Sequence, residues 1–434
     1  MLRLGIVADD LTGAMDSGVQ LAKWGLQTLV LLSSQDLPDV DAILTSTDSR
    51  AATPAEAYHR ARAAAQRLHD RSIYKKMDST LRGNVGSELD GVLDGLGLER
   101  ALVAPAAPFA GRATVGGYHR VHGVLLAETA FAHDPVAPVT ESHLPTLLAR
   151  QSRRRVGHLP LTVVEQGVDA VVAALGAESG SIVAADAVEA RHLRTLALAL
   201  QRMPDAWLPC GSAGLAEEWP QALGLSRPAQ APVPWPPDTR PVLVVAGSRH
   251  PVTLRQLQRA ESDGHLQLVH LSLWEPGETE AQQAEAPPSV GFEDAGASRS
   301  IVGRRAADGL LHASQEALSG LRAGRNVALT LSFGAYAAGQ QQATAEALAQ
   351  AAAWVLERVD LAGLFVTGGD TLRALCHTLD ATALRILGEV QPGAPAGRLL
   401  GGLGLEARVV TKAGAFGDDL TITRSIQFIQ GRQK

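Results

Sequence analysis

Two adjacent carboxylates follow the first apolar run of the chain, and carboxylates at such a place can orient a hydroxyl group or take up its proton. Asp9 and Asp10 come directly after Leu4–Ala8, and a helix-like stretch follows them. Because adjacent strand residues point to opposite sides, we expect one carboxylate to face a ligand and the other to cap the next turn or helix. Two turn-forming aspartates without a chemical role are the alternative. Asp16, further along the predicted helix, is equally well explained as a solvated residue.

The segment KKMDSTLRGNVGSE, residues 75–88, gathers several side chains that suit a small acid. Asp78, Ser79 and Thr80 are short hydrogen-bonding side chains. Arg82 offers a planar fork that matches a carboxylate. Two glycines and the N-terminus of the following predicted helix bring backbone N–H groups toward an anion. The pattern indicates a site for an acidic, hydroxylated small molecule, and an ordinary capped loop is the alternative.

Other cationic and imidazole side chains are weaker candidates for the same site. Arg50 ends the run TSTDSR and is either a second cation of the site or a surface residue. Arg112, His119 and His122 lie in APAAPFAGRATVGGYHRVHG, which either lines the site or forms a structural hairpin. The two histidines have no clustered cysteine or acidic third ligand, so they give little support for a metal site.

Three glycine-containing turns follow apolar runs in the second half of the chain, namely VVAGSRHP, FVTGGDTLRALC and VVTKAGAFGDD. Small residues at a helix N-terminus let phosphate oxygens meet backbone N–H groups. Lys412 can neutralise phosphate charge, and Asp370 or Asp418 can hold Mg²⁺ through water. A single turn of this kind is nonspecific, whereas three in one half of the chain favour a site for nucleotide phosphates. The chain has no G-x-x-x-x-G-K-[ST] loop, so a nucleotide site in it is not of the Walker type. It also has neither the G-x-G-x-x-G fingerprint of dinucleotide-binding folds nor the G-x-S-x-G nucleophile elbow of hydrolases.

Short apolar runs alternate with Ala- and Leu-rich helical stretches and place these groups. The expected strands are Leu4–Ala8, Ala42–Leu44, Ser72–Met77, Ala101–Ala104, Val242–Ala246, Asn326–Leu331, Gly363–Thr367 and Arg408–Lys412. Expected helices in the first half are Met15–Trp24, Pro54–Leu68 and Ser87–Leu96. Such alternation predicts an α/β fold with two domains, each with a mostly parallel β-sheet flanked by helices. Ligands of such sheets bind beyond the carboxyl ends of the strands, where the candidate residues lie.

Repeated prolines between Arg227 and Pro241 block a helix and indicate a linker. We therefore expect a substrate domain over residues 1–228, a Pro-rich linker over 229–241 and a nucleotide domain over 242–434. The irregular stretch Gln283–Ser300 is expected to form a long surface loop inside the second domain.

Charge and cysteine content narrow the class of protein. The chain has 434 residues with 39 basic and 45 acidic side chains, a net charge of −6, and no basic block. This balance argues against nonspecific binding of nucleic acid but allows a local cationic pocket. The N-terminal apolar stretch is short and ends in two aspartates, so neither a signal peptide nor a membrane span is expected. Two cysteines without a Cys-x-x-Cys pair suit the reducing cytoplasm.

The combined motifs resemble the four-carbon acid sugar kinases, the tetronate kinases that act on threonate and erythronate. The matching segments are IVADDLTGAMDSG, KKMDSTLRGNVGSEL, APAAPFAGRATVGGYHRVHG, DPVAPVTES, VAGSRHPVT, VTGGDT and VVTKAGAFGDDL. They occur in the order of the family and span nearly the whole chain. Each turn alone is nonspecific, but their combination is specific.

This resemblance implies an N-terminal domain that binds the sugar acid and a C-terminal domain that binds ATP. The implied substrate residues are Asp10, with its neighbour Asp9, Arg50, Asp78, Ser79, Thr80, Leu81 and the adjoining Arg82. The implied nucleotide residues are Ser248, Gly368, Gly369, Asp370, Thr371 and Gly414, to which the reasoning above adds Lys412. Asp10 and Asp78 are the candidates for the carboxylate that orients or deprotonates the reacting hydroxyl.

The expected reaction is ATP-dependent and Mg²⁺-dependent phosphorylation of the 4-hydroxyl group of D-threonate. D-erythronate and other sugar acids stay open, because they differ in stereochemistry that one sequence does not reveal. The branch acting on 3-oxo-tetronate carries an STFDS-type run where this chain has DSTLRG, so that substrate is less favoured. A nucleotide-dependent oxidoreductase and an acid-sugar sensor are the alternatives from other classes. The sequence leaves a homo-oligomer open.

Overall fold

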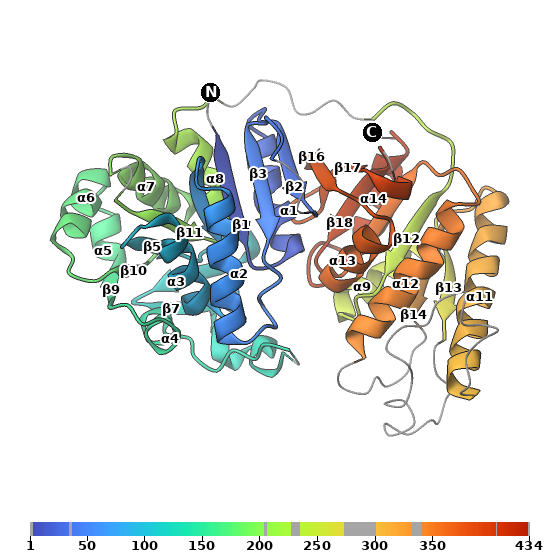
Figure 1. Cartoon of the computed structure of the whole chain (residues 1–434), viewed down its shortest axis with the longest axis horizontal. Coiled ribbons are helices and arrows are strands. Elements are labelled where there is room, and N and C mark those ends of the chain that lie inside the picture. Colours follow the sequence, from blue (N-terminus) through green and yellow to red (C-terminus); the bar gives the residue numbers. More distant parts are fainter. Residues whose placement is uncertain are drawn as a thin grey trace. The chain divides into compact units, whose positions relative to one another are not determined.

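The computed structural model describes residues 3–33, 37–134, 136–203, 206–226, 235–272, 301–331, 340–404 and 406–432. The chain divides into two compact units, of which unit 1 holds residues 1–31 and 36–229 and unit 2 holds residues 32–35 and 230–434 (Figure 1). The second unit thus includes a short segment from the first half of the sequence. Leu32 donates its backbone N–H to the carbonyl of Thr382 within that unit (3.0 Å).

The strands of unit 1 form a parallel sheet. Its order is β2 (Thr28–Leu31), β3 (Ala42–Ser46), β1 (Leu4–Ala8), β4 (Ser72–Lys76), β11 (Leu208–Gly211), β5 (Ala101–Ala104), β10 (Ile182–Ala185) and β9 (Val156–Leu159). The central strand β1 is buried along its whole length, as its unbroken apolar sequence requires of a strand covered on both faces.

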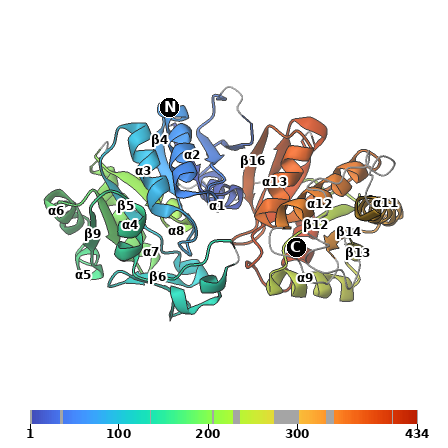
Figure 2. The ribbon, with the colours of Figure 1, turned by 60° about the horizontal axis from the view of Figure 1, so that its bottom comes forward.

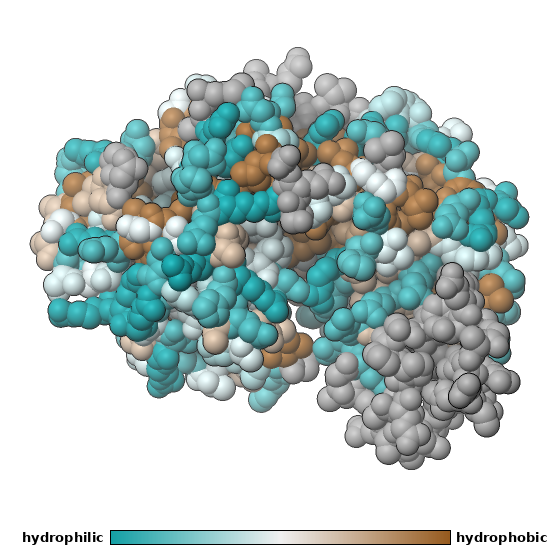
Figure 3. All heavy atoms as spheres, in the orientation of Figure 1, coloured by the Kyte–Doolittle hydropathy of each residue, from teal (hydrophilic) through white to brown (hydrophobic). Residues whose placement is uncertain are grey.

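Helices of unit 1 connect these strands. They are α1 (Leu11–Ala22), α2 (Pro54–Arg67), α3 (Val85–Leu96), α4 (Leu144–Gln151), α5 (Leu161–Val164), α6 (Val168–Ala177), α7 (Ala190–Gln201) and α8 (Ala213–Ala222). Helix α2 begins with Pro54 after a capping box in which Thr53 and Glu56 bond reciprocally. Its buried residues Ala57, Ala61 and Ala65 recur every four positions, so one narrow stripe faces inward. Hydrophilic residues cover the opposite side of this helix in Figure 3.

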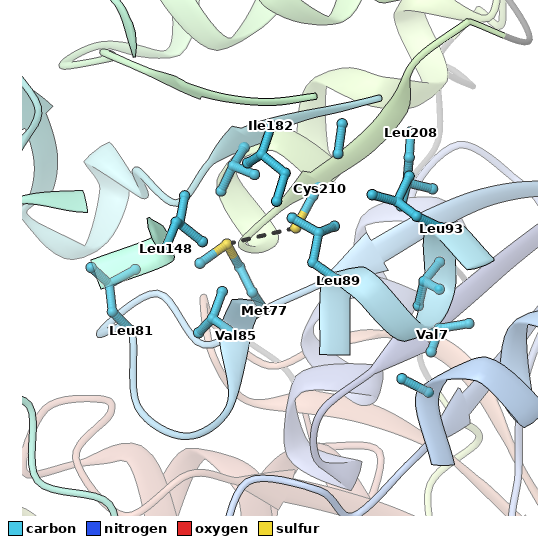
Figure 4. Packing of buried hydrophobic residues seen from close by; sticks show 14 of the residues in the cluster. Val7, Met77, Leu81, Val85, Leu89, Leu93, Leu148, Ile182, Leu208 and Cys210 are labelled. Atoms are coloured by element: carbon cyan, nitrogen blue, oxygen red, sulfur yellow. Dashed lines mark hydrogen bonds between the residues drawn. The ribbon is translucent and has the colours of Figure 1, made fainter. Parts of the chain in front are cut away.

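Helices α2, α3 and α4 share one hydrophobic core with the strands (Figure 4). Leu89 and Leu93 of α3 enter this core together with Leu148 of α4. The thiol of Cys210 lies 3.8 Å from the sulfur of Met77 within the same cluster. This packing fixes the residues that directly follow β4, which is where a candidate site was expected.

An antiparallel sheet of β6 (Arg112–Val115), β7 (Tyr118–Val121) and β8 (Val124–Leu125) follows β5 in unit 1. The Pro/Gly-rich segment APAAPFAGRATVGGYHRVHG therefore forms a hairpin, which is one of the two structures expected for it from the sequence. Asp186 is buried, and it accepts hydrogen bonds from the N–H groups of Gly116 (2.7 Å) and Gly117 (2.9 Å), which form the turn between β6 and β7. The hairpin is thereby tied to the segment after β10.

The sheet of unit 2 is mostly parallel, in the order β13 (Gln267–Leu271), β14 (Val327–Leu331), β12 (Val242–Ala246), β15 (Gly363–Thr367), β18 (Arg408–Lys412), β17 (Pro395–Leu400) and β16 (Ala383–Glu389). Strand β17 runs antiparallel to both of its neighbours in this order, β18 and β16. The helices among the described residues of this unit are α9 (Pro251–Ser262), α11 (Ile301–Arg322), α12 (Gln341–Leu356), α13 (Gly369–Thr378) and α14 (Thr421–Ile429). Figure 2 shows α11 beside α12 and near β13 and β14, against which it packs.

The predicted fold class is confirmed, and several predicted strands match to the residue, among them β1, β5, β12, β15 and β18. The first helix begins at Leu11 rather than Met15, because Asp10 caps it, and it ends at Ala22 rather than Trp24. The predicted domain boundaries stay a prediction, since residues 227–234, around the start of the predicted linker, lie outside the described residues, as does the loop expected at 283–300. None of the helices in the described ranges combines the length and the apolar composition needed to cross a membrane.

Candidate functional site

Three neighbouring parallel strands of unit 1 bring together the residues that follow them. Strand β1 pairs with β3 and with β4 so that Ala8 lies opposite Ser46 and Lys76. The segments that follow are Asp9–Asp10, Thr47–Arg50 and Met77–Arg82. Since the carboxyl ends of parallel strands meet at one edge, residues far apart in sequence become neighbours there.

The two adjacent aspartates have different roles, as the alternation along a strand predicts. Asp10 caps α1, and its Oδ1 accepts a hydrogen bond from the N–H of Gly13 (2.7 Å). Asp9 is buried, and its Oδ2 accepts from Nε (2.8 Å) and Nη2 (2.6 Å) of Arg50. Arg50 also reaches Asp10 Oδ2 with Nη1 (2.9 Å). Arg50 is therefore part of the cluster and not a surface residue.

The charges of this cluster stabilise one another. Burial opposes ionisation of Asp9, but Arg50, Lys76 and Lys75 outweigh it and keep the pKa of the Asp9 carboxyl below its usual value. Burial likewise disfavours the Arg50 cation, while Asp10, Asp9 and Asp78 raise the pKa of its guanidinium well above the usual value. Both side chains are therefore charged at neutral pH.

Asp78, Thr80 and Arg82 form a second group beside the first. Asp78 Oδ2 accepts from Thr80 Oγ1 (2.6 Å) and from Arg82 Nε (2.6 Å), and its Oδ1 lies 3.9 Å from Arg50 Nη2. Arg82 also binds Asp134 Oδ2 (3.1 Å) and lies over the ring of Phe131. Burial opposes the charge of Asp78, yet Arg82 and Arg50 hold the pKa of its carboxyl well below the usual value. Both predicted substrate arginines thus bind carboxylates of the protein itself.

Ser79 is held by the hairpin. Its hydroxyl accepts from Nη1 of Arg112, and its carbonyl lies 2.8 Å from Nε2 of His119. The other ring nitrogen of His119 lies 2.9 Å from Thr114 Oγ1. His119 is buried, and burial lowers its pKa to about 4, so a neutral ring donates from Nε2 to Ser79. Arg112 and His119 therefore belong to the site as supports of the loop after β4.

Leu81 differs from the other members of the predicted substrate run. Its side chain lies in the core cluster with Val85 and Leu89 (Figure 4). Its backbone takes the left-handed region at φ 57°, and its N–H donates to the carbonyl of Asp78 (3.0 Å). The Leu81 side chain anchors the loop, so only its backbone can face a ligand.

Lys75 and Lys76 were not predicted as site residues. The side chain of Lys75 pairs with Glu88 Oε2 at 2.7 Å, and both are buried. Burial raises the pKa of the Glu88 carboxyl, and Lys75 opposes this. Glu88 Oε1 accepts from Ser49 Oγ (2.8 Å), which connects the pair to the residue before Arg50. The signal in the sequence was two adjacent lysines at the end of the expected strand Ser72–Met77, because an unpaired charge is costly to bury within a sheet.

Of two other predicted candidates, His122 has mainly structural surroundings, whereas Asp16 interacts electrostatically with Arg112. His122 adopts φ 49°, and its ring lies against Gly111, where a methyl group would overlap it. Asp16 lies inside α1, and its carbonyl accepts from Gln20 Nε2 (3.3 Å). Burial lowers the pKa of the Arg112 guanidinium, and the Asp16 carboxylate opposes this. The part of the chain that the structure describes contains no group of three or more His, Cys, Asp or Glu side chains that could hold a metal ion.

In unit 2 the three predicted glycine turns meet at the carboxyl ends of β12, β15 and β18. The N–H groups of Gly247 and Ser248 donate to the carbonyl of Thr367, and that of Gly368 donates to the carbonyl of Lys412. A methyl group at Gly414 would overlap Ser248 Oγ and come within 3.3 Å of the Cβ atoms of Ser248 and His250, so the turns after β12 and β18 approach closely. Gly368 adopts φ 107° and directly precedes α13.

The first turn of α13 places the N–H groups of Gly369, Asp370 and Thr371 at the N-terminus of the helix, where the hydrogen bonds of a helix leave backbone donors unused. Such a helix N-terminus suits phosphate oxygens. The Asp370 carboxylate is exposed, with Arg373 Nη2 at 3.2 Å. Asp418 Oδ2 pairs with Arg424 (2.6 Å).

Lys412 does not point outward from its turn. It is buried, and its ammonium donates to Thr253 Oγ1 (3.1 Å) and to the carbonyls of Ala413 (3.1 Å) and Gly414 (3.0 Å). Burial lowers the pKa of Lys412 to about 7. These contacts use all three N–H donors of a lysine, so Lys412 supports the turn rather than offering a charge to a ligand.

Both units match known family models. Residues 4–219 match a sugar-binding N-terminal domain, and residues 243–422 match a nucleotide-binding C-terminal domain. The chain is 34% identical to a D-threonate kinase of Salmonella typhimurium over 443 residues, with 99% of each protein covered. It is 33% identical to a D-erythronate kinase of Heliobacterium modesticaldum, covering 96% of this chain and 95% of that relative.

A 3-oxo-tetronate kinase of Brucella melitensis is 36% identical over a shorter stretch, 51% of this chain and 54% of the relative. Among solved structures, a Salmonella typhimurium LT2 protein described as a candidate tRNA synthase has a TM-score of 0.76 at 26% identity. That comparison covers 98% of this chain and 99% of the other. The likeness extends over both units.

Proposed function

Because this chain belongs to the family of four-carbon acid sugar kinases, we propose that it transfers the γ-phosphoryl group of ATP to the 4-hydroxyl group of D-threonate. The products are 4-phospho-D-threonate, ADP and a proton. The observation that carries the proposal is the cluster formed by Asp9, Asp10, Arg50, Asp78 and Arg82 beyond β1, β3 and β4. A second supporting feature is the set of three glycine turns in unit 2.

The cluster in unit 1 suits a small acid with several hydroxyl groups. Its ionised carboxylates accept hydrogen bonds from hydroxyls, and its guanidinium groups attract the substrate carboxylate. Arg82 is the better candidate for that carboxylate, because its side chain is 24% exposed while Asp78 and Asp134 hold its fork. The backbone N–H groups of Ser79 and Thr80 can complete the contact, since that of Leu81 already donates to the carbonyl of Asp78.

Asp10 and Asp78 are the candidates for orienting the reacting hydroxyl. Arg82 and Arg50 hold the pKa of Asp78 well below its usual value, against the effect of burial, so it is a weak base but a steady acceptor. This suits phosphoryl transfer, in which positioning and charge stabilisation matter more than early removal of the proton.

The turns of unit 2 fit a nucleotide, because glycines leave room for phosphate oxygens at the first turn of α13. Ser248 and Thr371 place hydroxyls beside this turn. Mg²⁺ would enter with the ATP phosphates and neutralise the charge that develops on them. The exposed Asp370 carboxylate is the residue we assign to hold it, through water.

D-erythronate is the second candidate substrate, because a D-erythronate kinase resembles this chain nearly as closely as the D-threonate kinase does. The two acids carry the same groups and differ in the configuration of one hydroxyl. We place the reaction in the cytoplasm, where ATP is available and the two cysteines, Cys210 and Cys376, stay reduced.

The test is ADP release by the purified chain with Mg²⁺-ATP and a panel of acids. The panel contains D- and L-threonate, D- and L-erythronate, 3-oxo-tetronate and five-carbon aldonates. ADP release that depends on D-threonate supports the proposal, and preference for erythronate changes only the substrate. Folded protein that binds ATP but releases no ADP with any of the acids contradicts the kinase proposal, and reduction of a nicotinamide cofactor instead would favour an oxidoreductase.

A further inference from the structure

One oxygen of Asp9 has no hydrogen-bond partner although it is buried. Asp9 is 2% exposed, and both of its contacts with Arg50 are made by Oδ2. Asp9 Oδ1 has no partner within the described residues. A buried carboxylate oxygen without a donor costs free energy, so such an atom is usually completed by water or by a ligand.

The ammonium of Lys76 is similarly incomplete. Lys76 is 5% exposed and ends β4, next to β1. Its Nζ donates to the carbonyl of Met77 (2.7 Å), and no other acceptor for it is found in the described ranges. An ammonium group has three N–H donors, so two remain available. The neighbouring Lys75 differs, because its ammonium donates to both Glu88 and the carbonyl of Lys76.

Gly13 shows that these two unsatisfied groups are close to each other. A methyl group on Gly13 would lie 2.8 Å from Lys76 Nζ and 3.6 Å from Asp9 Oδ1. Both atoms therefore face the same small region beside the first turn of α1. Lys76 also lowers the pKa of Asp9, although burial has the larger, opposing effect. Any larger side chain at position 13 would push the ammonium away.

We propose that Lys76 and Asp9 Oδ1 together bind one hydroxyl group of the substrate, with Lys76 Nζ donating a hydrogen bond to its oxygen and Asp9 Oδ1 accepting a hydrogen bond from its O–H. This inference rests on the proposed function and adds Lys76 as a residue that determines substrate specificity. A carboxylate does not fit the pair, because it has no proton to offer Asp9. A hydroxyl satisfies both groups at once, being donor and acceptor.

The bound group is a secondary hydroxyl, at C2 or C3, and not the reacting one. The 4-hydroxyl must be open to the phosphoryl donor, whereas Asp9 and Lys76 are both nine-tenths buried or more. A site built to hydrogen-bond a hydroxyl discriminates strongly against an analogue that lacks it, because its buried polar groups are then left unpaired. Lys76 and Asp9 therefore determine which sugar acids are used.

The test compares kcat/KM for the preferred tetronate with kcat/KM for its 2-deoxy and 3-deoxy analogues, which keep the carboxylate and the 4-hydroxyl. We expect the native enzyme to lose roughly 10⁴-fold with one analogue. Lys76→Met should lose roughly 10- to 100-fold with the full substrate but little with that analogue, since the hydroxyl that Lys76 binds is already missing. The ratio between the two acids then falls, which a merely structural role of Lys76 would not produce.

The matched control is Lys75→Met, which removes the adjacent buried ammonium. It should lower stability and leave the ratio between full and deoxy substrates unchanged. Equal losses of Lys76→Met on all three acids, or none, overturn the inference. If Lys76→Met does not fold, the native enzyme still tests the inference. Similar kcat/KM values of the native enzyme for the full substrate and for both deoxy acids would also overturn the inference. A native enzyme that phosphorylates no sugar acid would instead refute the proposed function.

Discussion

Arg50 binds a single oxygen of Asp9 with two nitrogens, Nε at 2.8 Å and Nη2 at 2.6 Å from Oδ2. The third nitrogen of the same guanidinium binds Asp10. One arginine thus fixes both carboxylates that follow β1, and it leaves the other oxygen of Asp9 facing Lys76 and Gly13. The planar fork of arginine is required for this arrangement, since a lysine ammonium cannot span the two carboxylates in the same way.

Replacement of Arg50 by lysine is therefore expected to lower kcat/KM for the sugar acid on the order of 10²-fold, because small displacements of positioning groups have effects of this size. Steady-state kinetics with a fixed, saturating ATP concentration measure it. Arg62→Lys on the exposed side of α2 serves as the control and should leave kcat/KM nearly unchanged. Wild-type kinetics of Arg50→Lys would exclude the assigned role.

The buried pair of Lys75 and Glu88 makes a prediction about stability. Lys75→Met leaves the Glu88 carboxylate without its counter-charge and should destabilise the protein by about 3–5 kcal/mol. The double variant Lys75→Met/Glu88→Gln should recover much of this loss, because a neutral amide can still accept from Ser49. Thermal and denaturant unfolding measure both variants. A double variant that is no more stable than Lys75→Met would show that the pair is not the cause.

His119 predicts how stability depends on pH. Its pKa in the folded protein is lowered to about 4 by burial, below the unfolded value of 6.5, so between these values the unfolded chain binds more protons. The contribution of His119 to the free energy of unfolding is fully present above pH 6.5. It declines by on the order of 3 kcal/mol as the pH falls toward 4. Unfolding midpoints between pH 7 and 4.5 measure this.

His119→Gln is the comparison variant, because an amide can donate to the Ser79 carbonyl and does not titrate in this range. The difference between its pH profile and that of the native protein isolates His119 from the other histidines with lowered pKa, His192 and His250. Parallel profiles would mean that His119 contributes nothing to the acid sensitivity.

The close approach of Gly414 to Ser248 predicts an effect on nucleotide binding. The methyl group of Gly414→Ala would overlap Ser248 Oγ and separate the two turns. We expect the KM for ATP to rise about tenfold or more, since displaced backbone N–H groups no longer fit the phosphates. The KM for the sugar acid, bound in unit 1 under the proposed function, should change little.

Gly176→Ala is the matched control for this change, because nothing lies within 4 Å of the added methyl group and the position is helical. It should be neutral or slightly stabilising. An unchanged KM for ATP in Gly414→Ala would argue that the turn after β18 does not contact the nucleotide.

Much of the fold could be predicted from the sequence where the signal is local. The runs that became β1, β5 and β12 are unbroken apolar segments, and a strand covered on both faces needs no other pattern. Strands β16 and β17 were missed, because charged and glycine residues interrupt their hydrophobic pattern and their pairing is antiparallel. The stability of these two strands depends on contacts with neighbouring strands, which local sequence patterns do not reveal.

For the candidate site too, some features could be predicted from the sequence and others depend on the tertiary structure. The residues after each strand are fixed by the chain itself, so Asp9, Asp10, Asp78 and the glycine turns were found from their positions alone. Only the folded structure decides which atoms of these residues are available to a ligand. Leu81 turned into the core, Lys412 bonded back to its own turn, and Lys76 came to lie beside an unpaired oxygen of Asp9. The sequence determined which chemical groups stand at the strand ends, because local hydrophobic patterns set where the strands stop. Only the tertiary structure decided which groups are already paired and which stay available, because burial and partners depend on segments far apart in the chain.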